Sequence, residues 1–331
     1  MIRLLKWLLA AIVASAAFGA AWLAWFALRP LPLRESPLEF TIRQGSALRQ
    51  ASQQLADGGV ALSPVQFTLL ARVLGKAAEI KAGSYQVETG ITPMQLLGKL
   101  TRGDVSQAEI AFIEGWTFRQ MRAALDGNPA IRHDTRELSE AEILQRIGAS
   151  GNAAEGQFFP DTYLFAKNAS DLDVLRRAYR VMQKNLAQEW ETRDTESPYA
   201  TPYEALIMAS IIEKETGIAS DRPLIGSVFV NRLRQNMPLQ TDPTVIYGMG
   251  EQFDGNLRKR DLQRDTSFNT YTRSGLPPTP IAMPGLASIQ AALRPAKTDY
   301  LYFVARGDGT SEFSRSLDAH NRAVAKYQKR K

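Results

Sequence analysis

The first feature of the hydrophobic pattern is an uncharged run from Trp7 to Leu28. As a helix, this run is long enough to cross a bilayer core of roughly 30 Å. Arg3 and Lys6 precede it, and positive charge next to a membrane span favours the cytoplasmic side. The pattern therefore predicts a cytoplasmic N-terminus at residues 1–6, a transmembrane helix at residues 7–28, and the rest of the chain outside.

A cleaved signal peptide is the competing interpretation of the same run. Ala14-Ser15-Ala16 resembles the small-residue site at which such peptides are cut. The apolar run continues well past that site, through Leu28, which a cleaved signal does not need. We therefore expect an uncleaved anchor.

Strand and helix patterns alternate in the next part of the chain. Residues 29–37 contain three prolines and predict a short, stiff linker. Residues 38–103 then predict a small α/β unit, punctuated by glycines. Its expected elements are strands at Leu38–Ile42 and Tyr85–Val87, helices at Ser46–Ala56 and Pro64–Leu74, and a helix that opens at Thr92-Pro93 with Pro at its first position.

An intermediate region, residues 104–200, has a weaker pattern. It predicts a strand at Ser106–Phe112 and helices at Thr117–Leu125 and Asp173–Glu189. The aromatic segment 158–163 predicts a turn that either packs on the core or lines a cleft.

The last third, residues 201–331, predicts a mixed α/β domain that would carry the catalytic chemistry. Thr201-Pro202-Tyr203-Glu204 has the form of a capping box, and Gly217 is a plausible helix stop. A second helix at Pro223–Arg234, a long Pro/Gly-rich section to Gly285 and a hairpin around Gly307-Asp308-Gly309 follow. The whole pattern predicts the α+β class behind one membrane helix.

Charge and residue inventory exclude several kinds of function. The net charge is +6, but Arg3, Lys6 and Arg29 account for half of it, so the remainder is too weakly basic to favour nucleic acid. The chain has no Cys, and His133 and His320 are its only histidines, so no metal site or cofactor is expected. No GxSxG, P-loop or GxGxxG motif is present. We expect His320 to be a surface or packed histidine rather than a base.

Two carboxylates at the end of one helix are the leading candidates for chemistry. On a helical wheel of residues 202–216, Glu215 falls within an apolar stripe of Met208, Ile211 and Ile212, and Glu213 points the other way. Burial raises the pKa of a carboxyl group, which suits a general acid. We therefore assign Glu215 as the candidate acid and Glu213 as a supporting group. The alternative is that both face solvent at a helix end.

A second polar cluster could bind a sugar, which needs hydrogen-bonding groups for its hydroxyls and ring faces for its apolar side. Two segments, 239–248 and 269–278, supply such groups. The candidate substrate-binding residues are Gln240, Thr241, Asp242, Tyr247, Asn269 and Tyr271. A structural loop with Asx-turns is the alternative.

At these residues the chain resembles the endolytic murein transglycosylases of the YceG-like family. The matching segments are 209–216, 230–233, 239–248, 269–271, 275–278, 295–298 and 320–321, with a further match at 81–85. The likeness is looser in residues 104–200, where 160–162 matches. The resemblance implies a single-pass inner-membrane protein with a LysM-like unit and a periplasmic catalytic domain. It also implies cleavage within peptidoglycan glycan strands without hydrolysis, and contact with peptidoglycan synthases is a further expectation. The family's catalytic Glu falls on Glu215.

Two other functions remain open at this stage. A glycoside hydrolase would use Glu215 together with a second carboxylate, Asp242 or Asp161. A non-catalytic peptidoglycan-binding scaffold would need neither acid.

Overall fold

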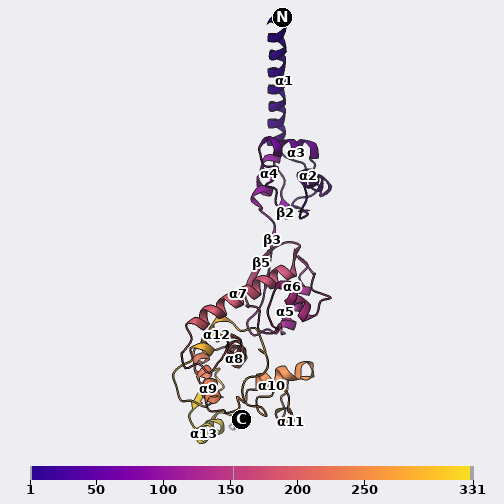
Figure 1. Ribbon diagram of the computed structural model, residues 1–331. Helices are drawn as coiled ribbons and strands as arrows, with labels where there is room; N and C mark the ends of the chain where they lie inside the picture. The colour runs from indigo at the N-terminus through magenta and orange to yellow at the C-terminus, as the bar shows by residue number, and fades with distance from the viewer. Residues whose placement is uncertain (1, 152, 329–331) are drawn as a thin grey trace. The chain divides into compact units, whose positions relative to one another are not determined.

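The computed structural model describes residues 2–151 and 153–328, and contacts divide the chain into two compact units (Figure 1). Unit 1 comprises Met1–Glu109, Ala130–Arg132 and Leu164–Ala169. Unit 2 comprises Ile110–Pro129, His133–Tyr163 and Ser170–Lys331. The fold is mixed, with helices and short two-stranded sheets. The predicted domain boundaries are not tested by this division and stay predictions.

Unit 1 begins with the long apolar helix α1, Ile2–Leu28. Its segment Leu5–Leu28 has a mean hydropathy of 1.9 and is long and apolar enough to cross a membrane. The end of this helix is different, because Phe26 and Ala27 are buried in the core of unit 1. The predicted linker is also packed there: Leu31 is buried, and its N–H donates to the Ile91 carbonyl at 2.8 Å.

The rest of unit 1 is a strand pair with helices. Strand β1, Leu38–Ile42, pairs antiparallel with β2, Gly83–Val87, so that Leu38 faces Val87. Alternate residues of β1 are buried, as its pattern predicts. The helices are α2 (Leu48–Asp57), α3 (Pro64–Val73) and α4 (Pro93–Arg102). These five elements confirm the predictions for this part, with helix ends shifted by one or two residues.

Two further strand pairs and three helices follow. Strand β3 (Gln107–Ala111) pairs with β5 (Thr162–Ala166), and β4 (Ile131–Arg132) pairs with β6 (Ala169–Ser170). The helices are α5 (Phe118–Asp126), α6 (Glu140–Ile147) and α7 (Asp171–Glu191). The prediction anticipated α5 and α7 but not α6.

The core of unit 2 forms around α8, Pro202–Glu215. It packs against α12 (Leu286–Leu293), α9 (Arg222–Arg234) and α7. Gly226 allows the close approach of α9 and α12, because a Cβ there would lie 2.4 Å from the Ala291 carbonyl oxygen. Every residue of α8 from Ala205 to Ile212 is buried. The predicted apolar stripe of Met208, Ile211 and Ile212 is thus buried, but so is the opposite side of the helix over these two turns.

The C-terminal part of unit 2 contains short elements that the sequence pattern did not reveal. They are α10 (Asp242–Met249), the 3-10 turn Gly250–Gln252, α11 (Lys259–Gln263) and α13 (Leu317–Tyr327). The predicted hairpin is confirmed as β7 (Tyr302–Ala305) and β8 (Ser311–Ser314).

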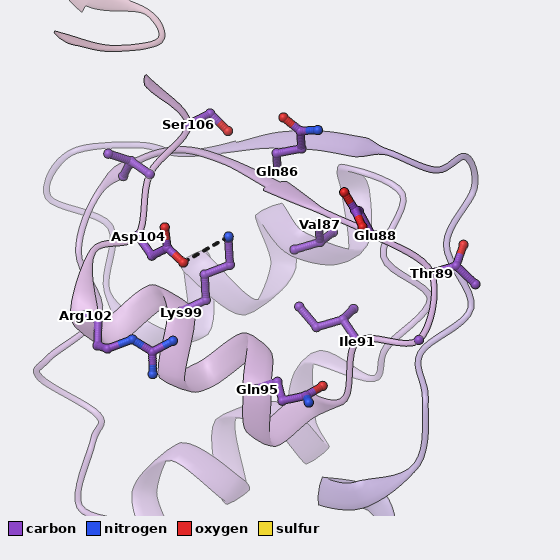
Figure 2. Close-up of a pocket in the computed structure, with 12 residues that line it drawn as sticks. Gln86, Val87, Glu88, Thr89, Ile91, Gln95, Lys99, Arg102, Asp104 and Ser106 are labelled. Atoms are coloured by element: carbon purple, nitrogen blue, oxygen red, sulfur yellow. Dashed lines mark hydrogen bonds and ion pairs between the residues drawn. The ribbon is translucent and has the colours of Figure 1, made fainter. Parts of the chain in front are cut away.

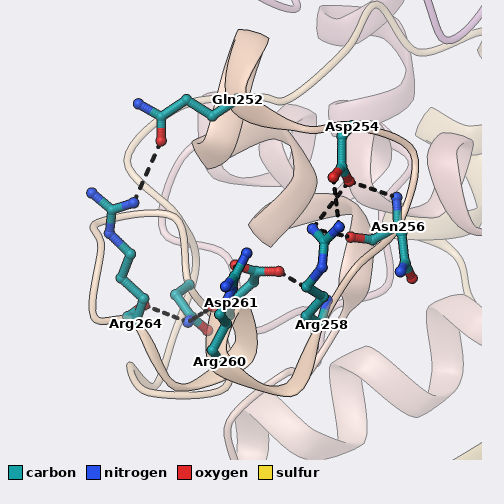
Figure 3. A network of polar contacts seen from close by, with 8 residues as sticks. Gln252, Asp254, Asn256, Arg258, Arg260, Asp261 and Arg264 are labelled. Carbon is teal, nitrogen blue, oxygen red and sulfur yellow. Dashed lines mark hydrogen bonds and ion pairs between the residues drawn. The ribbon is translucent and has the colours of Figure 1, made fainter.

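A polar network holds the loop around α11 (Figure 3). Asp254 accepts hydrogen bonds from the Arg258 guanidinium at 2.6 and 3.2 Å, and Asp261 accepts from the Arg258 N–H at 2.9 Å. Arg264 donates to the Gln252 side chain at 3.4 Å. These contacts give a loop with little apolar content a defined shape.

Candidate active site

A cavity of about 490 Å³ in unit 2 brings together groups from four parts of the chain. Glu215 enters it from the end of α8, and Gln240, Asp242 and Tyr271 enter from the predicted polar cluster. Arg232 of α9 and His320 of α13 add to its polar lining. Three of the six predicted substrate-binding residues therefore share one cavity with the predicted acid.

Glu215 has the properties of a group that exchanges a proton near neutral pH. Its side chain is partly buried, and burial raises its pKa to about 7. The hydroxyl of Thr241 donates to Oε1 and lowers the pKa, whereas the negative charge of Asp242 raises it. Both protonation states are therefore accessible at the pH where most proteins work.

The position of Thr241 is fixed by the backbone on either side of it. Gln240, directly before it, adopts a left-handed conformation with φ of 52°. The N–H groups of Gln240 and Thr241 donate to the carbonyl and hydroxyl of Thr270 at 3.0 and 3.1 Å. Thr244 closes the turn by donating to the Thr241 carbonyl at 2.8 Å. Thr241 is consequently buried behind the acid rather than exposed to a ligand.

Asp242 and Tyr271 form one hydrogen-bonded pair in the cavity wall. The Tyr271 hydroxyl donates to Asp242 Oδ1 at 2.5 Å. Burial raises the pKa of Tyr271, and the bond to Asp242 raises it further, so the phenol keeps its proton. Asp242 is thus held as a hydrogen-bond acceptor beside Glu215.

Sequence reasoning missed Arg232, which supplies a positive charge to the same cavity. Its guanidinium donates to the Leu301 carbonyl at 2.7 Å and to Gln240 Oε1 at 3.2 Å, and it lies 5.1 Å from the centroid of the Tyr302 ring. His320 stacks on the same ring with centroids 5.3 Å apart. Burial and the nearby Arg232 lower the pKa of His320, which favours the neutral imidazole. Both residues occur in segments that carry the family resemblance, which was the available signal.

Glu213 is held differently from Glu215. Its Oε2 accepts from the Gly285 N–H at 3.0 Å and from the Ser288 hydroxyl at 2.7 Å, at the start of α12. Its Oε1 lies 3.5 Å from the Arg222 guanidinium, and only 6% of its side chain is exposed. A carboxylate with these partners joins α8, α9 and α12, and it has no access to the cavity around Glu215.

Tyr247 and Asn269, the other two predicted substrate-binding residues, lie outside the cavity lining. The Asn269 amide donates to the carbonyls of Leu262 and Arg264 at 3.0 and 2.7 Å, and only 1% of the residue is exposed. Tyr247 donates to Glu155 Oε2 at 3.1 Å and packs on the Phe268 ring. Both residues hold the loops that carry Thr241 and Tyr271.

Glu155 is another carboxyl group buried in unit 2, and the sequence did not reveal it. Its Oε1 accepts from the Phe118 N–H at 3.0 Å, at the start of α5. Burial raises its pKa to about 7, and the bonds from Phe118 and Tyr247 oppose this rise. Among the residues that the structure describes, Glu155 has no hydrogen bond to the cavity lining. We therefore expect it to affect the free energy of unfolding.

Replacing Glu155 by Gln is expected to stabilise the protein at alkaline pH. As pH rises from 4.5 to about 7 the unfolded chain loses this proton while the folded chain keeps it, so stability falls with pH. The shift corresponds to a loss of about 3 kcal/mol by pH 8, which the Gln variant avoids. Thermal unfolding of the full chain in detergent at pH 5 and pH 8 measures this. A Gln variant less stable than the parent at pH 8 contradicts it, and exposed Glu137→Gln is the control.

Unit 1 has a hollow of its own, about 740 Å³ in volume (Figure 2). Amide, hydroxyl and charged side chains line it, and Lys99 pairs with Asp104 at 3.1 Å. Its carboxylates, Glu88 and Asp104, are exposed. The hollow therefore offers hydrogen bonds to a polar ligand, but its two carboxylates are more exposed than Glu215.

The site in unit 2 is thus an acid–base centre built on one partly buried carboxyl group in a polar and aromatic cavity. Residues 40–326 match the model of the YceG-like family, and the chain belongs to this family.

Named relatives and a solved structure agree with this assignment. An endolytic murein transglycosylase of Bacillus subtilis (strain 168) is 34% identical over 310 residues, which cover 88% of this chain and 85% of the relative. A protein of the same name from Streptococcus pneumoniae (strain ATCC BAA-255 / R6) is 26% identical, and the match covers 86% of this chain and 57% of that relative. The crystal structure of a YceG-like protein from Listeria monocytogenes matches with a TM-score of 0.55 and 29% identity, covering 86% of this chain and 98% of that one.

Proposed function

We propose that the protein is a membrane-anchored endolytic transglycosylase that cuts peptidoglycan glycan strands. The observation that carries this proposal is Glu215, a carboxyl group with a pKa near 7 in a polar cavity. The names of the relatives supply the substrate class. The cavity suits a sugar, because it combines hydrogen-bonding groups with the rings of Tyr271 and Tyr302.

In the proposed reaction Glu215 acts twice. Protonated Glu215 gives its proton to the glycosidic oxygen between N-acetylmuramic acid and N-acetylglucosamine as the bond from C1 to that oxygen breaks. The Glu215 carboxylate then takes the proton of the C6 hydroxyl of N-acetylmuramic acid as that oxygen bonds to C1. The product is a 1,6-anhydro end, and Glu215 returns to its protonated form. No water is activated, so a second carboxylate is not required.

Other residues have supporting roles in this proposal. Gln240, Asp242 and Tyr271 contact the sugar in the cavity, and Thr241 adjusts the acidity of Glu215. Neutral His320 would act as a ring and hydrogen-bonding surface, not as a base.

The apolar helix and unit 1 complete the proposal. The helix α1 anchors the protein in the inner membrane, and Arg3 and Lys6 place its N-terminus in the cytoplasm and the catalytic unit in the periplasm. The order β1-α2-α3-β2, with an antiparallel strand pair, supports a LysM-like unit with affinity for glycan. Peptidoglycan synthases are proposed partners, on the family resemblance alone.

A two-carboxylate hydrolase is the second candidate, because Asp242 lies in the same cavity as Glu215. Asp161 does not support it: its side chain accepts from its neighbour Thr162 at 2.7 Å and is outside the cavity lining. A non-catalytic scaffold would leave peptidoglycan uncut.

Digestion of purified peptidoglycan by the full chain in detergent tests the proposal. The full chain is used because Phe26 and Ala27 of α1 belong to the core of unit 1. We expect long fragments to appear first, as internal cleavage requires, with anhydro ends seen by mass spectrometry. Reducing ends would establish the hydrolase, and no cleavage would favour the scaffold.

Replacing Thr241 or Asp242, the two polar neighbours of Glu215, should shift the pH dependence of activity in opposite directions. Activity needs protonated Glu215, so it is expected to fall as pH rises through about 7. Thr241→Val removes a donor that favours the carboxylate, raises the pKa and moves this fall to higher pH. Asp242→Asn removes a negative charge, lowers the pKa of Glu215 and moves the fall in activity to lower pH. Each shift is expected to be on the order of one pH unit. Initial rates from pH 5 to 9 measure this, and shifts in the same direction would refute it.

A further inference from the structure

Helix α3 of unit 1 exposes an apolar face. Val65, Leu69 and Val73 are four residues apart, so they lie on one side of the helix, and they are 73, 44 and 63% exposed. Leu74 follows at 40%. We call these four residues the apolar face of α3. The opposite side of the helix is already buried in the core, so packing within unit 1 does not explain this face. A contiguous exposed apolar patch marks an interaction surface.

The apolar face of α3 belongs to a helix that touches α1. The two helices are in contact, and Figure 1 shows α3 at the end of unit 1 from which α1 extends. Helix α1 continues unbroken into unit 1, where Phe26 and Ala27 are 0% and 2% exposed and Leu23 packs against the same core. The apolar surface of α1 therefore continues directly into unit 1, with no linker between them.

The length of α1 determines how close unit 1 lies to the bilayer. The part of the apolar segment outside the core of unit 1, Leu5 to Trp22, is about 27 Å long at 1.5 Å per residue. A bilayer core of roughly 30 Å requires all of it. The edge of the bilayer must then fall where unit 1 begins. Trp25 and Arg29 lie at that level, with the guanidinium 4.7 Å from the ring centroid, and such residues are typical of a membrane interface.

We propose that unit 1 rests on the bilayer and that the apolar face of α3 lies in its outer interfacial layer. The occupant of this face is lipid, because the same bilayer that receives α1 borders the side of unit 1 where α3 lies. Arg72, exposed beside the apolar face, would meet lipid phosphates. This inference rests on the proposed membrane anchor. It adds a second contact, which would fix the height and tilt of unit 1 on the membrane.

Site-specific fluorescence tests the proposal without altering the core. The chain has no cysteine, so a single introduced cysteine carries the only label. Full-length Leu69→Cys, Gln53→Cys and Ile12→Cys proteins are labelled with a polarity-sensitive fluorophore and reconstituted in bilayers. Gln53 is the matched control, exposed on α2 of the same unit, and Ile12 reports on the anchor. Quenching is measured with brominated lipid and with aqueous iodide.

We expect brominated lipid to quench the Leu69→Cys and Ile12→Cys probes, and iodide to quench the Leu69→Cys probe at least about fivefold less than the Gln53→Cys probe. Equal iodide quenching at Leu69→Cys and Gln53→Cys, with Ile12→Cys still in lipid, would overturn the proposal and leave the anchor intact. Protection of Leu69→Cys from both quenchers would mean that a protein covers the face, which also overturns it. Iodide quenching of Ile12→Cys would refute the anchor itself.

Discussion

Glu215→Gln is expected to lower the rate of peptidoglycan cleavage by about 10³-fold or more, because a positioned general acid contributes about 10²–10⁴-fold and Glu215 acts in both proton transfers. The amide has nearly the shape of the carboxyl group and still offers an oxygen to Thr241, so folding should not change. Release of fragments over time, measured for the full chain in detergent, gives the ratio of rates.

The matched control is Glu191→Gln, which removes an exposed acid from α7 and should leave the rate unchanged. Thermal unfolding of both variants checks that they fold like the parent. If Glu215→Gln kept more than about a tenth of the parent rate, a loss smaller than general acid catalysis accounts for, another group would have to be the acid.

Glu213→Ala is expected to destabilise unit 2 by about 3 kcal/mol or more, the usual cost of breaking a buried ion pair. The change leaves the Arg222 guanidinium and the Gly285 N–H without their acceptor in a place where the Glu213 side chain is only 6% exposed. Relief of repulsion with Glu114, whose pKa is raised by burial and then by Glu213, offsets part of this cost. Thermal unfolding in detergent should show a midpoint lower by on the order of 10 °C.

Glu213→Gln separates the contribution of the ion pair with Arg222 from that of the hydrogen bonds with Gly285 and Ser288. Its amide oxygen still accepts from Gly285 and Ser288, so this variant should lose less stability than Glu213→Ala. An unfolding midpoint of Glu213→Ala within about 2 °C of the parent would contradict the role assigned here, since that shift corresponds to no more than about 1 kcal/mol.

Local signals were enough to predict much of the fold. Strand β1 was predicted to the residue, because apolar and polar residues alternate along Leu38–Ile42. Helix α4 begins where Thr92 caps it, and its side chain accepts from the Gln95 N–H at 3.2 Å. The capping box at α8 is only half formed, since the Glu204 carboxylate accepts from Ala200 rather than from Thr201. Caps and alternation act within a few residues, which is why sequence reveals them.

Two of the missed helices, α10 and α12, lack a contrast between two faces or a clear boundary. Helix α12 is short and mostly apolar, so a periodicity argument has little polar side to detect. Helix α10 begins inside a segment predicted as a polar turn, and tertiary packing decides its state. For α6 a signal existed: Ser139 and Glu142 form a capping box before an apolar run.

The candidate site shows the limit of the helical wheel. The wheel predicted that an apolar stripe distinguishes Glu215, but both sides of α8 are buried from Ala205 to Ile212. What distinguishes Glu215 is its long-range surroundings, namely the Thr241 hydroxyl and the cavity that Arg232 and His320 help to form. These residues are far apart in the sequence, so no local pattern could place them together. Glu155 was missed for the same reason.

The most direct test of the central claim is the source of the oxygen at the new end of the cut strand. Peptidoglycan is digested by the full chain in water enriched in ¹⁸O, beside the Glu215→Gln variant, and the products are weighed by mass spectrometry. If Glu215 takes the proton of the C6 hydroxyl while the C6 oxygen bonds to C1, the new ends are anhydro and carry no ¹⁸O. These ends are then absent with the variant. New ends that are reducing sugars with one ¹⁸O at C1 would mean that water is the nucleophile and would contradict the account.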